Sequence, residues 1–111
     1  MAGRFLISKR SNGEFQFVLK AGNGEPILSS EGYKAKPSCI NGIESVRTNS
    51  QNDARYERKT SSSERPYFVL KAANGEIVGT SELYSSNGAL EKGVASVRLN
   101  APTAAVDDPT A

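Results

Sequence analysis

The stretch Phe17-Val18-Leu19-Lys20-Ala21-Gly22-Asn23-Gly24-Glu25 returns as Phe68-Val69-Leu70-Lys71-Ala72-Ala73-Asn74-Gly75-Glu76, 51 residues further along the chain. Aligning residues 17–49 with residues 68–100 at this offset needs no gap and gives 16 identities in 33 positions. The chain is therefore one unit, duplicated. Because units of this size are near the lower limit for an independent hydrophobic core, we expect residues 1–101 to form a single compact domain of two repeats, about 1–50 and 51–101.

The composition excludes several protein classes. Of the 111 residues, 37% are hydrophobic and 23% charged, and the net charge is +2. Lys and Arg alternate with Glu throughout, whereas a nucleic-acid-binding protein usually gathers its basic residues on one face. No apolar run approaches the roughly 20 residues that span a bilayer, and the first residues lack the apolar stretch of a secretion signal. We expect a cytoplasmic protein, monomeric and without membrane contact.

The pattern of each unit indicates three strands followed by a helix. Phe15, Phe17 and Leu19 alternate with polar residues, which is typical of a strand with one buried face. Asn23-Gly24 predicts a tight type I′ turn, and from Lys36 onward apolar residues at three-residue intervals (Ile40, Ile43, Val46) predict an amphipathic helix. The predicted strands are 4–9, 15–21, 25–30, 55–60, 66–72 and 76–80, and the predicted helices follow residues 35 and 87.

The ends of the predicted elements follow from single residues. Asn49 and its copy Asn100 stand where a left-handed residue would end each helix. Gly42 and Gly93 share a mid-helix position where glycine costs about 0.5–1 kcal/mol relative to alanine, and we interpret them as points where the helix lies close to the sheet. Residues 102–111 show no periodicity, so they predict a disordered tail.

The order βββα-βββα favours an α+β fold. Both meanders join into one antiparallel sheet or two abutting sheets, with both helices on one face and a pseudo-twofold axis between the repeats. The sequence resembles the YegP-like family of small bacterial tandem-repeat proteins. The resemblance is carried by residues 17–25, by residues 30–33 with their copy 81–84, and by residues 93–98. It implies units that share a sheet and exchange the last strand of each unit, and it implies no assigned activity.

The missing side chains argue against catalysis. The chain has no histidine, which removes the commonest general base near pH 7 and the commonest transition-metal ligand. Its one cysteine, Cys39, aligns with Leu90, so we interpret the thiol as core packing, as is usual for a free cysteine. We therefore predict that the chain is not an enzyme, and we predict no cofactor and no metal site.

Four polar pairs are identical in the two copies, and they allow two interpretations. A structural interpretation is that an Arg–Glu pair and a tyrosine hydroxyl join helix, loop and strand in each copy, and a functional one is that two equivalent surface sites exist. We favour the structural interpretation because an internal repeat keeps what its fold requires. The pairs are Lys20/Lys71, Glu31/Glu82, Tyr33/Tyr84 and Arg47/Arg98.

The face of the sheet away from the helices is the candidate interaction surface, since it combines apolar side chains with a rim of lysines. The leading hypothesis is a non-catalytic binding or accessory module for a protein partner. Weak binding of single-stranded nucleic acid is an alternative, disfavoured because Tyr67 alone offers an exposed aromatic ring. An enzyme that uses Glu, Lys or Tyr in a cleft between the repeats is a further, weaker alternative, and it would place Tyr33, Tyr84, Arg47 or Arg98 in that cleft. The residues of this candidate surface are Val18, Lys20, Tyr67, Val69 and Lys71, with Leu6, Gln16, Leu28 and Lys59 beside them.

Overall fold

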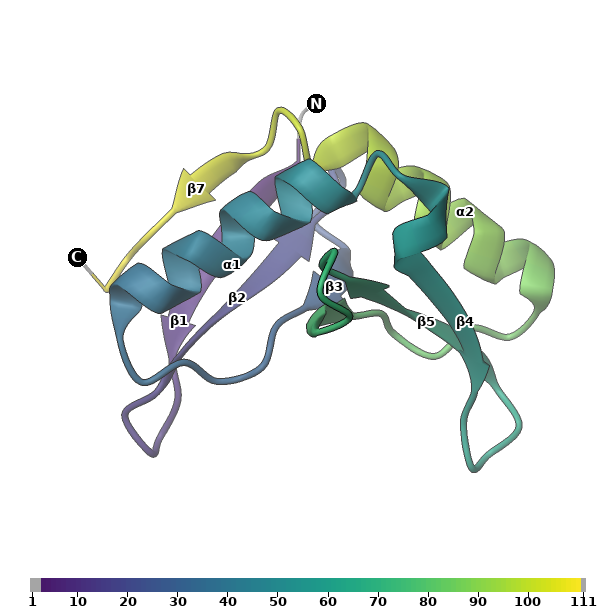
Figure 1. Ribbon diagram of the computed structural model, residues 1–111, viewed down its shortest axis with the longest axis horizontal. Helices are drawn as coiled ribbons and strands as arrows, with labels where there is room; N and C mark the ends of the chain where they lie inside the picture. The colour runs from purple at the N-terminus through teal and green to yellow at the C-terminus, as the bar shows by residue number, and fades with distance from the viewer. Residues whose placement is uncertain (1–2, 111) are drawn as a thin grey trace.

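The computed structural model describes residues 3–110 and contains the predicted strands and helices, with boundaries that shift by one or two residues (Figure 1). The strands are β1 (Arg4–Lys9), β2 (Phe15–Lys20), β3 (Pro26–Ser29), β4 (Tyr56–Thr60), β5 (Pro66–Lys71), β6 (Ile77–Thr80) and β7 (Ala105–Asp107). The helices are α1 (Lys36–Asn49), α2 (Asn87–Asn100) and the short 3₁₀ helix η1 (Asp53–Arg55).

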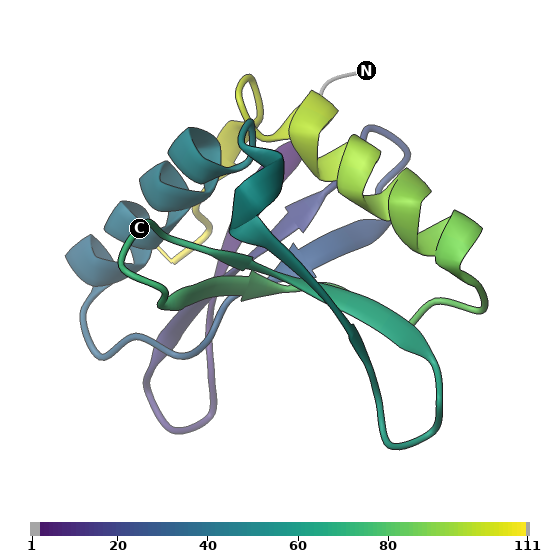
Figure 2. The ribbon, with the colours of Figure 1, turned by 45° about the vertical axis from the view of Figure 1, so that its right-hand side comes forward.

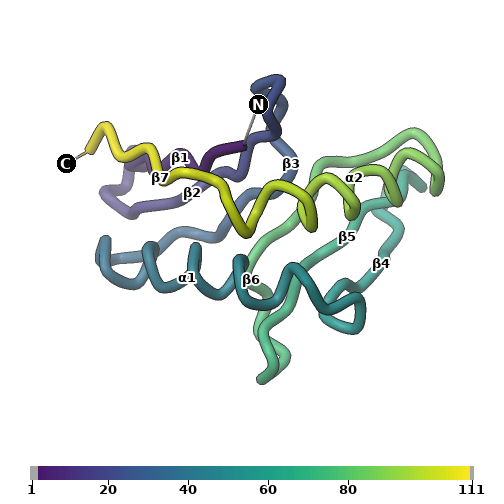
Figure 3. The backbone as a smooth tube through the Cα atoms, turned by 90° about the horizontal axis from the view of Figure 1, so that it is seen from above, coloured from purple at the N-terminus to yellow at the C-terminus, as the bar shows by residue number. Residues whose placement is uncertain are grey.

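All seven strands form one sheet in the order β4-β5-β6-β3-β2-β1-β7. Neighbouring strands are antiparallel except β1 and β7, which are parallel. Both helices cover the same face of the sheet, as the view from above shows (Figure 3). The sheet bends into an arch, and the loops of the β1–β2 and β4–β5 hairpins point away from the helices (Figure 2). The predicted α+β fold of two repeats with both helices on one face is confirmed, although the sheet is mixed.

The two meanders meet at a narrow junction. Strands β3 and β6 are joined by a single residue pair, Ser29 with Thr80. Beside this pair Leu28 occupies the space where a Cβ on Gly79, its copy in the second repeat, would lie. Two leucines related by the pseudo-twofold axis would collide here, so one copy has glycine. Leu28 pairs with Leu19 and is 1% exposed, which corrects its predicted place on the open face.

The helices hold the two halves together across that junction. Helix α1 packs on β2 of its own repeat and also on β5 and β6 of the other, and α2 packs on β5 and on β3. The buried side of α1 carries Cys39, Ile43 and Val46, which confirms the packing role of the cysteine. Ile40, predicted on the buried stripe, is 41% exposed because a 3.6-residue period favours Cys39 at that turn.

Each repeat contains the same aromatic stack beneath its helix. The Phe17 ring lies parallel to Tyr33 with centroids 6.4 Å apart, and Phe68 lies parallel to Tyr84 at 6.2 Å. A Cβ on Gly42 would clash with the hydroxyl of Tyr33, and a Cβ on Gly93 would clash with the hydroxyl of Tyr84. The helix glycines therefore permit close packing, as predicted, but against the tyrosine rings.

The two helices meet at their C-termini, where four backbone carbonyls per helix lack intrahelical partners. The Arg47 guanidinium donates to the carbonyls of Ala101 and Pro102 at 2.9 and 3.3 Å, and Arg98 donates to the carbonyl of Gln51 at 3.4 Å. Positive charge also opposes the negative end of a helix dipole. Each arginine thus joins the end of its own helix to the residues that follow the other repeat's helix.

Asn49 and Asn100 do not end their helices in the left-handed conformation, contrary to the sequence prediction. Glu64 is the one non-glycine residue with positive φ among residues 3–110. The asparagine side chains instead donate to the carbonyls of Ser45 and Ser96, one turn earlier, at 2.8 Å. This local hydrogen bond keeps both asparagines helical.

The tight turns are also of a different type from the one predicted. In the turn after β2, the amide of Gly24 donates to the carbonyl of Ala21 and the amide of Ala21 donates to the carbonyl of Glu25, both at 2.9 Å. Only Gly24 has positive φ (85°), whereas a type I′ turn requires two such residues. This is the pattern of a type I turn followed by a left-handed residue. The turn between β4 and β5 has the same bonds but places Glu64 at that position, with φ 62°.

The prediction of a disordered tail is also corrected for the described residues 102–110. Residues 105–107 form β7, which pairs with residues 4–6 of β1. The preceding Ala104 is 2% exposed and belongs to the hydrophobic core. A three-residue strand of small residues gives no periodic signal, so the sequence pattern missed it.

A fragment that ends at Ser50 is expected not to fold cooperatively. Its helix α1 would lose the contacts with β5 and β6, and Phe5 and Ile7, both fully buried, would lose the cover of the second half. Circular dichroism during thermal unfolding checks this, with the full chain as the control. A sharp melting transition of the fragment as a monomer would contradict it.

Replacing Glu64 with glycine is expected to stabilise the protein by about 0.5–1 kcal/mol. The left-handed conformation costs a residue with a Cβ roughly 1–2 kcal/mol, which glycine avoids. Glycine also raises the backbone entropy of the unfolded chain, and this offsets part of the stabilisation. Urea unfolding of E64G measures the change. The neighbouring exposed substitution Ser63→Gly serves as control and should destabilise or leave stability unchanged.

Candidate functional site

The structure places the five predicted surface residues on one face of the sheet. Val18 pairs with Ser29, Ser29 with Thr80, and Thr80 with Val69, and residues paired across strands share a face. Lys20, Tyr67 and Lys71 lie two positions away on the same strands and therefore on the same face. This open sheet face, defined by Val18, Lys20, Tyr67, Val69 and Lys71, lies opposite the helices.

The open sheet face offers less than the sequence predicted. Val69 is 3% exposed, so it contributes little apolar contact surface. The ammonium groups of Lys71 and Lys59 lie 2.7 and 3.2 Å from the two oxygens of the Glu57 carboxylate. Hydrogen bonds from Lys71 and then Lys59 lower the pKa of Glu57. One carboxylate thus offsets the positive rim that would attract a phosphate backbone.

The repeated polar residues divide into two groups. Tyr33 and Tyr84 are half-buried in the aromatic stacks, and burial raises the pKa of both hydroxyls. Glu31 and Glu82 are exposed. The expected Arg–Glu pair within this set is not seen among residues 3–110, because Arg47 pairs with Glu44 and Arg98 lies 3.8 Å from Asp53.

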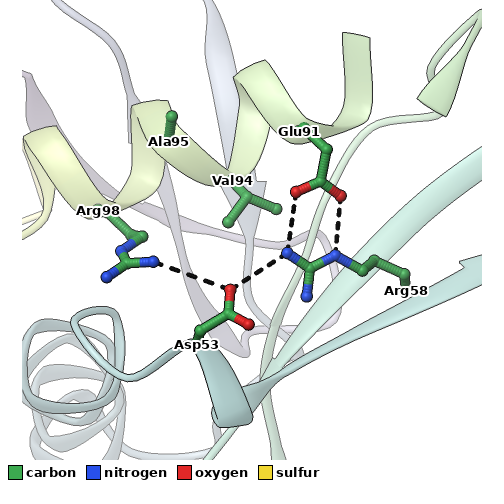
Figure 4. A pocket seen from close by; sticks show the side chains of 6 residues that line it. All are labelled: Asp53, Arg58, Glu91, Val94, Ala95 and Arg98. Carbon is green, nitrogen blue, oxygen red and sulfur yellow. Dashed lines mark hydrogen bonds and ion pairs between the residues drawn. The ribbon is translucent and has the colours of Figure 1, made fainter. Parts of the chain in front are cut away.

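A charged groove between α2 and the edge strand β4 is the most distinctive site of the molecule (Figure 4). Arg58 of β4 reaches Glu91 of α2 through two hydrogen bonds, of 2.8 and 3.0 Å. The same guanidinium donates to Asp53 of η1 at 3.2 Å. These side chains border a hollow of about 350 Å³, and a second hollow of about 380 Å³ continues along β4 toward the start of α2. The charged groove is lined by Asp53, Arg58, Glu91, Val94, Ala95 and Arg98.

The charged groove breaks the symmetry of the repeats. At the 51-residue offset, Arg58 corresponds to Ile7 and Glu91 to Ile40. Asp53 corresponds to Ala104, which is buried in the core. At these positions the first half is apolar and the second half is charged. The sequence signal for the groove lies in positions where the two copies differ, whereas the repeated polar pairs are positions where they agree.

The electrostatics of the groove favour fixed charge over proton transfer. Hydrogen bonding to Arg58 lowers the pKa of Glu91, and hydrogen bonding to Glu91 raises the pKa of Arg58. Both groups therefore keep their charge near neutral pH, whereas a general acid or base needs a pKa close to the working pH. Of the four residues expected in a catalytic cleft between the repeats, Arg98 alone lines this groove. The groove can recognise charge, because Arg58 and Glu91 hold each other in their ionised forms.

Within residues 3–110, no group of three or more cysteine or acidic side chains is arranged to hold a metal ion. In the same part of the chain, no helix is long and apolar enough to cross a membrane.

The edge that corresponds to β4 in the first half is covered. Strand β7 lies beside β1 and α1 (Figure 1). Its end is held where Asp108 pairs with Lys36 of α1 at 2.9 Å. On the outer side of β4 no strand of residues 3–110 is paired. The two halves thus show the same edge in a filled and an unfilled form.

A family model for the domain of unknown function DUF1508 matches the chain twice, over residues 11–57 and 61–108. The chain belongs to this family. Each DUF1508 match extends past a helix into the strand that follows it, β4 in the first match and β7 in the second. These strands join the other half of the sheet, as the YegP-like resemblance implied.

Relatives of the DUF1508 chain come from several bacteria. A UPF0339 protein of Acinetobacter baylyi is 54% identical over 110 residues, 99% of each chain. The UPF0339 protein YegP of Escherichia coli K12 is 52% identical, over 99% of this chain and 100% of its own. The solution NMR structure of E. coli yegP, a protein of unknown function, superposes with a TM-score of 0.93 at 51% identity, covering 98% of this chain and 94% of its own. The solution NMR structure of a UPF0339 protein from Shewanella oneidensis gives 0.91 at 52% identity, covering 97% and 92%. The YegP-like resemblance is confirmed.

The attachment of β7 is expected to weaken in acid. Hydrogen bonds from Thr110 and Lys36 lower the pKa of Asp108 in the folded protein. The carboxylate therefore stabilises the fold above its ordinary pKa of about 3.9, and that stabilisation is lost as pH falls through the lowered value. Amide exchange of residues 105–107 should rise over this range, and in Asp108→Asn it should already be raised near neutral pH. An equal effect of Asp107→Asn, an exposed neighbour, would contradict the role of the ion pair.

Proposed function

We propose that this DUF1508 chain is a non-catalytic cytoplasmic binding module whose partner is another protein, and that the partner binds at the charged groove between α2 and β4. The observation that supports this is the difference between the halves at equivalent positions. A scaffold that needed only to fold could close both halves with apolar contacts like those of Ile7. The second half instead keeps an open edge with charges.

Chemistry of the groove favours a polypeptide partner. Arg98 has 43% of its side chain exposed, and its nearest carboxylate oxygen is 3.8 Å away on Asp53. Arginine and backbone groups at a strand edge recognise carboxylates and carbonyls of peptides. Ala95 is exposed and supplies apolar contact beside these charges, whereas Val94 is 3% exposed and contributes little. The mixture of charged and small apolar side chains is typical of a protein-binding patch.

Nucleic acid is a poorer partner for the same molecule. Lys71 of the open sheet face and Lys59 beside it share the Glu57 carboxylate, and the groove holds two acids beside its two arginines. A phosphate backbone is bound by unopposed positive charge. A nucleic-acid partner is therefore less favoured than a protein partner.

Charge reversal at Arg98 is expected to reduce partner capture by about tenfold, a loss of about 1.4 kcal/mol. The experiment compares tagged wild type, Arg98→Glu and Lys92→Glu as baits in bacterial lysate, with quantitative mass spectrometry of what is retained. Lys92 is an exposed residue of the same helix outside the groove lining, so it controls for the change in charge. Proteins retained equally by all three baits would contradict the proposal.

A further inference from the structure

The unpaired edge of β4 follows from the length of the chain between α1 and β4. Helix α1 ends at Asn49 and β4 begins at Tyr56. At the repeat offset, residues 54–56 correspond to β7, residues 105–107. The residues after α1 therefore serve at once as the counterpart of β7 and as the start of the strand that corresponds to β1. One segment cannot fill two neighbouring places in a sheet, so the place outside β4 has no strand from this chain.

The first half shows how such a place is filled. β7 pairs parallel to β1, with Ala105 beside Arg4 and Asp107 beside Leu6. Beyond it, Asp108 forms its ion pair with Lys36 in the first turn of α1. The occupant is thus an extended segment of small residues that ends in acids, held by backbone pairing to the edge strand and by one ion pair to the helix.

The second half offers the same kind of backbone edge, but Asn87 stands at the position that corresponds to Lys36, so a basic partner for the segment must come from elsewhere in the groove. At the outer edge of β4, the backbone from Glu57 to Thr60 has no paired strand within residues 3–110. Arg58, Lys59 and Arg98 line the two hollows along it together with two acidic residues, and Lys59 is also paired with Glu57. Arg98 has 43% of its side chain exposed and its nearest carboxylate oxygen 3.8 Å away, so an acidic residue of an added segment can pair with it. Lys59 and Thr60, at the far end of the groove with Asn87, stand where the acidic end of the segment would arrive.

Exposed strand edges also carry charges to prevent self-association, and a second copy of β4 is the obvious competitor for this edge. An antiparallel pair of β4 strands centred on Arg58 would set two arginines opposite each other, which is unfavourable. An acidic segment meets no such repulsion. In this register Arg58 therefore disfavours a second copy of β4 and not an acidic strand.

We propose that the outer edge of β4, together with the charged groove beside it, binds an extended acidic segment of a partner protein as an eighth strand parallel to β4. This inference rests on the proposed function and names the chemistry of its partner. The intramolecular pairing of β7 with β1 is its template.

The test uses the full chain, labelled with ¹⁵N, and a synthetic peptide with the sequence of residues 101–110, blocked at both ends. This peptide is the one strand already seen to pair with an edge of the fold. Since β7 holds the β1 edge at a high effective concentration, free peptide should bind at β4. Chemical shifts are expected to move at residues 57–60 and on the α2 face from Glu91 to Arg98. The affinity of the peptide is expected to fall about tenfold when both of its aspartates are replaced by asparagine.

A matched pair of protein variants tests the groove itself. Ala95→Trp fills the hollow, whereas Leu99→Trp adds the same ring one turn along α2 at a position that is 76% exposed. The first variant should abolish peptide binding and the second should leave it unchanged, with both retaining the circular dichroism of the wild type.

Two results would overturn the inference. Shift changes confined to β1 and Lys36 would mean that the peptide only exchanges with β7. No shift change at β4 at millimolar peptide would exclude strand addition there. If the peptide does not bind at β4 but Arg98→Glu still lowers capture from lysate, strand addition is wrong and the proposed function stands. If Arg98→Glu also leaves capture unchanged, the proposed function is wrong as well.

Discussion

The fold depends on how two helices hold together a sheet whose halves barely touch. Only Ser29 and Thr80 pair across the junction of β3 and β6, and one pair of this kind contributes little on its own. Cohesion comes from apolar burial, because α1 and α2 each reach across to strands of the other repeat. Leu28 fills the space above Gly79 at the centre of this arrangement. The two repeats thereby share one hydrophobic core.

Where two equivalent halves share one chain, the connection between them cannot be symmetric. The chain enters the second half directly from α1, and it leaves α2 with further residues to spare. The extra residues become β7 and cover the edge of β1, while the matching edge at β4 remains open. The charge network of Asp53, Arg58 and Glu91 lies at this open end. The asymmetry that suggests a function is therefore a consequence of the tandem arrangement.

Sequence patterns predicted much of the architecture and little of the candidate site. The repeat, the strand alternation and the helical stripe depend on local spacing, so the elements were found to within one or two residues. Leu28 was assigned to the wrong face because an extra residue, Ile27, enters β3 where the pairing register shifts, and no local pattern reveals such a bulge. Val69 was assigned to the correct face, but the arch of the sheet leaves it 3% exposed.

By itself, the sequence determined the duplication, the order of strands and helices, the buried role of Cys39, and the lack of histidine chemistry, because each of these is a property of residue type or of short-range periodicity. Only the tertiary structure decided that residues 105–107 pair with β1, that Glu57 pairs with two lysines, and that Arg58 meets Glu91 across 33 positions. These contacts join residues that are distant along the chain, and they exist because packing of the shared core fixes where each strand edge and helix end comes to lie.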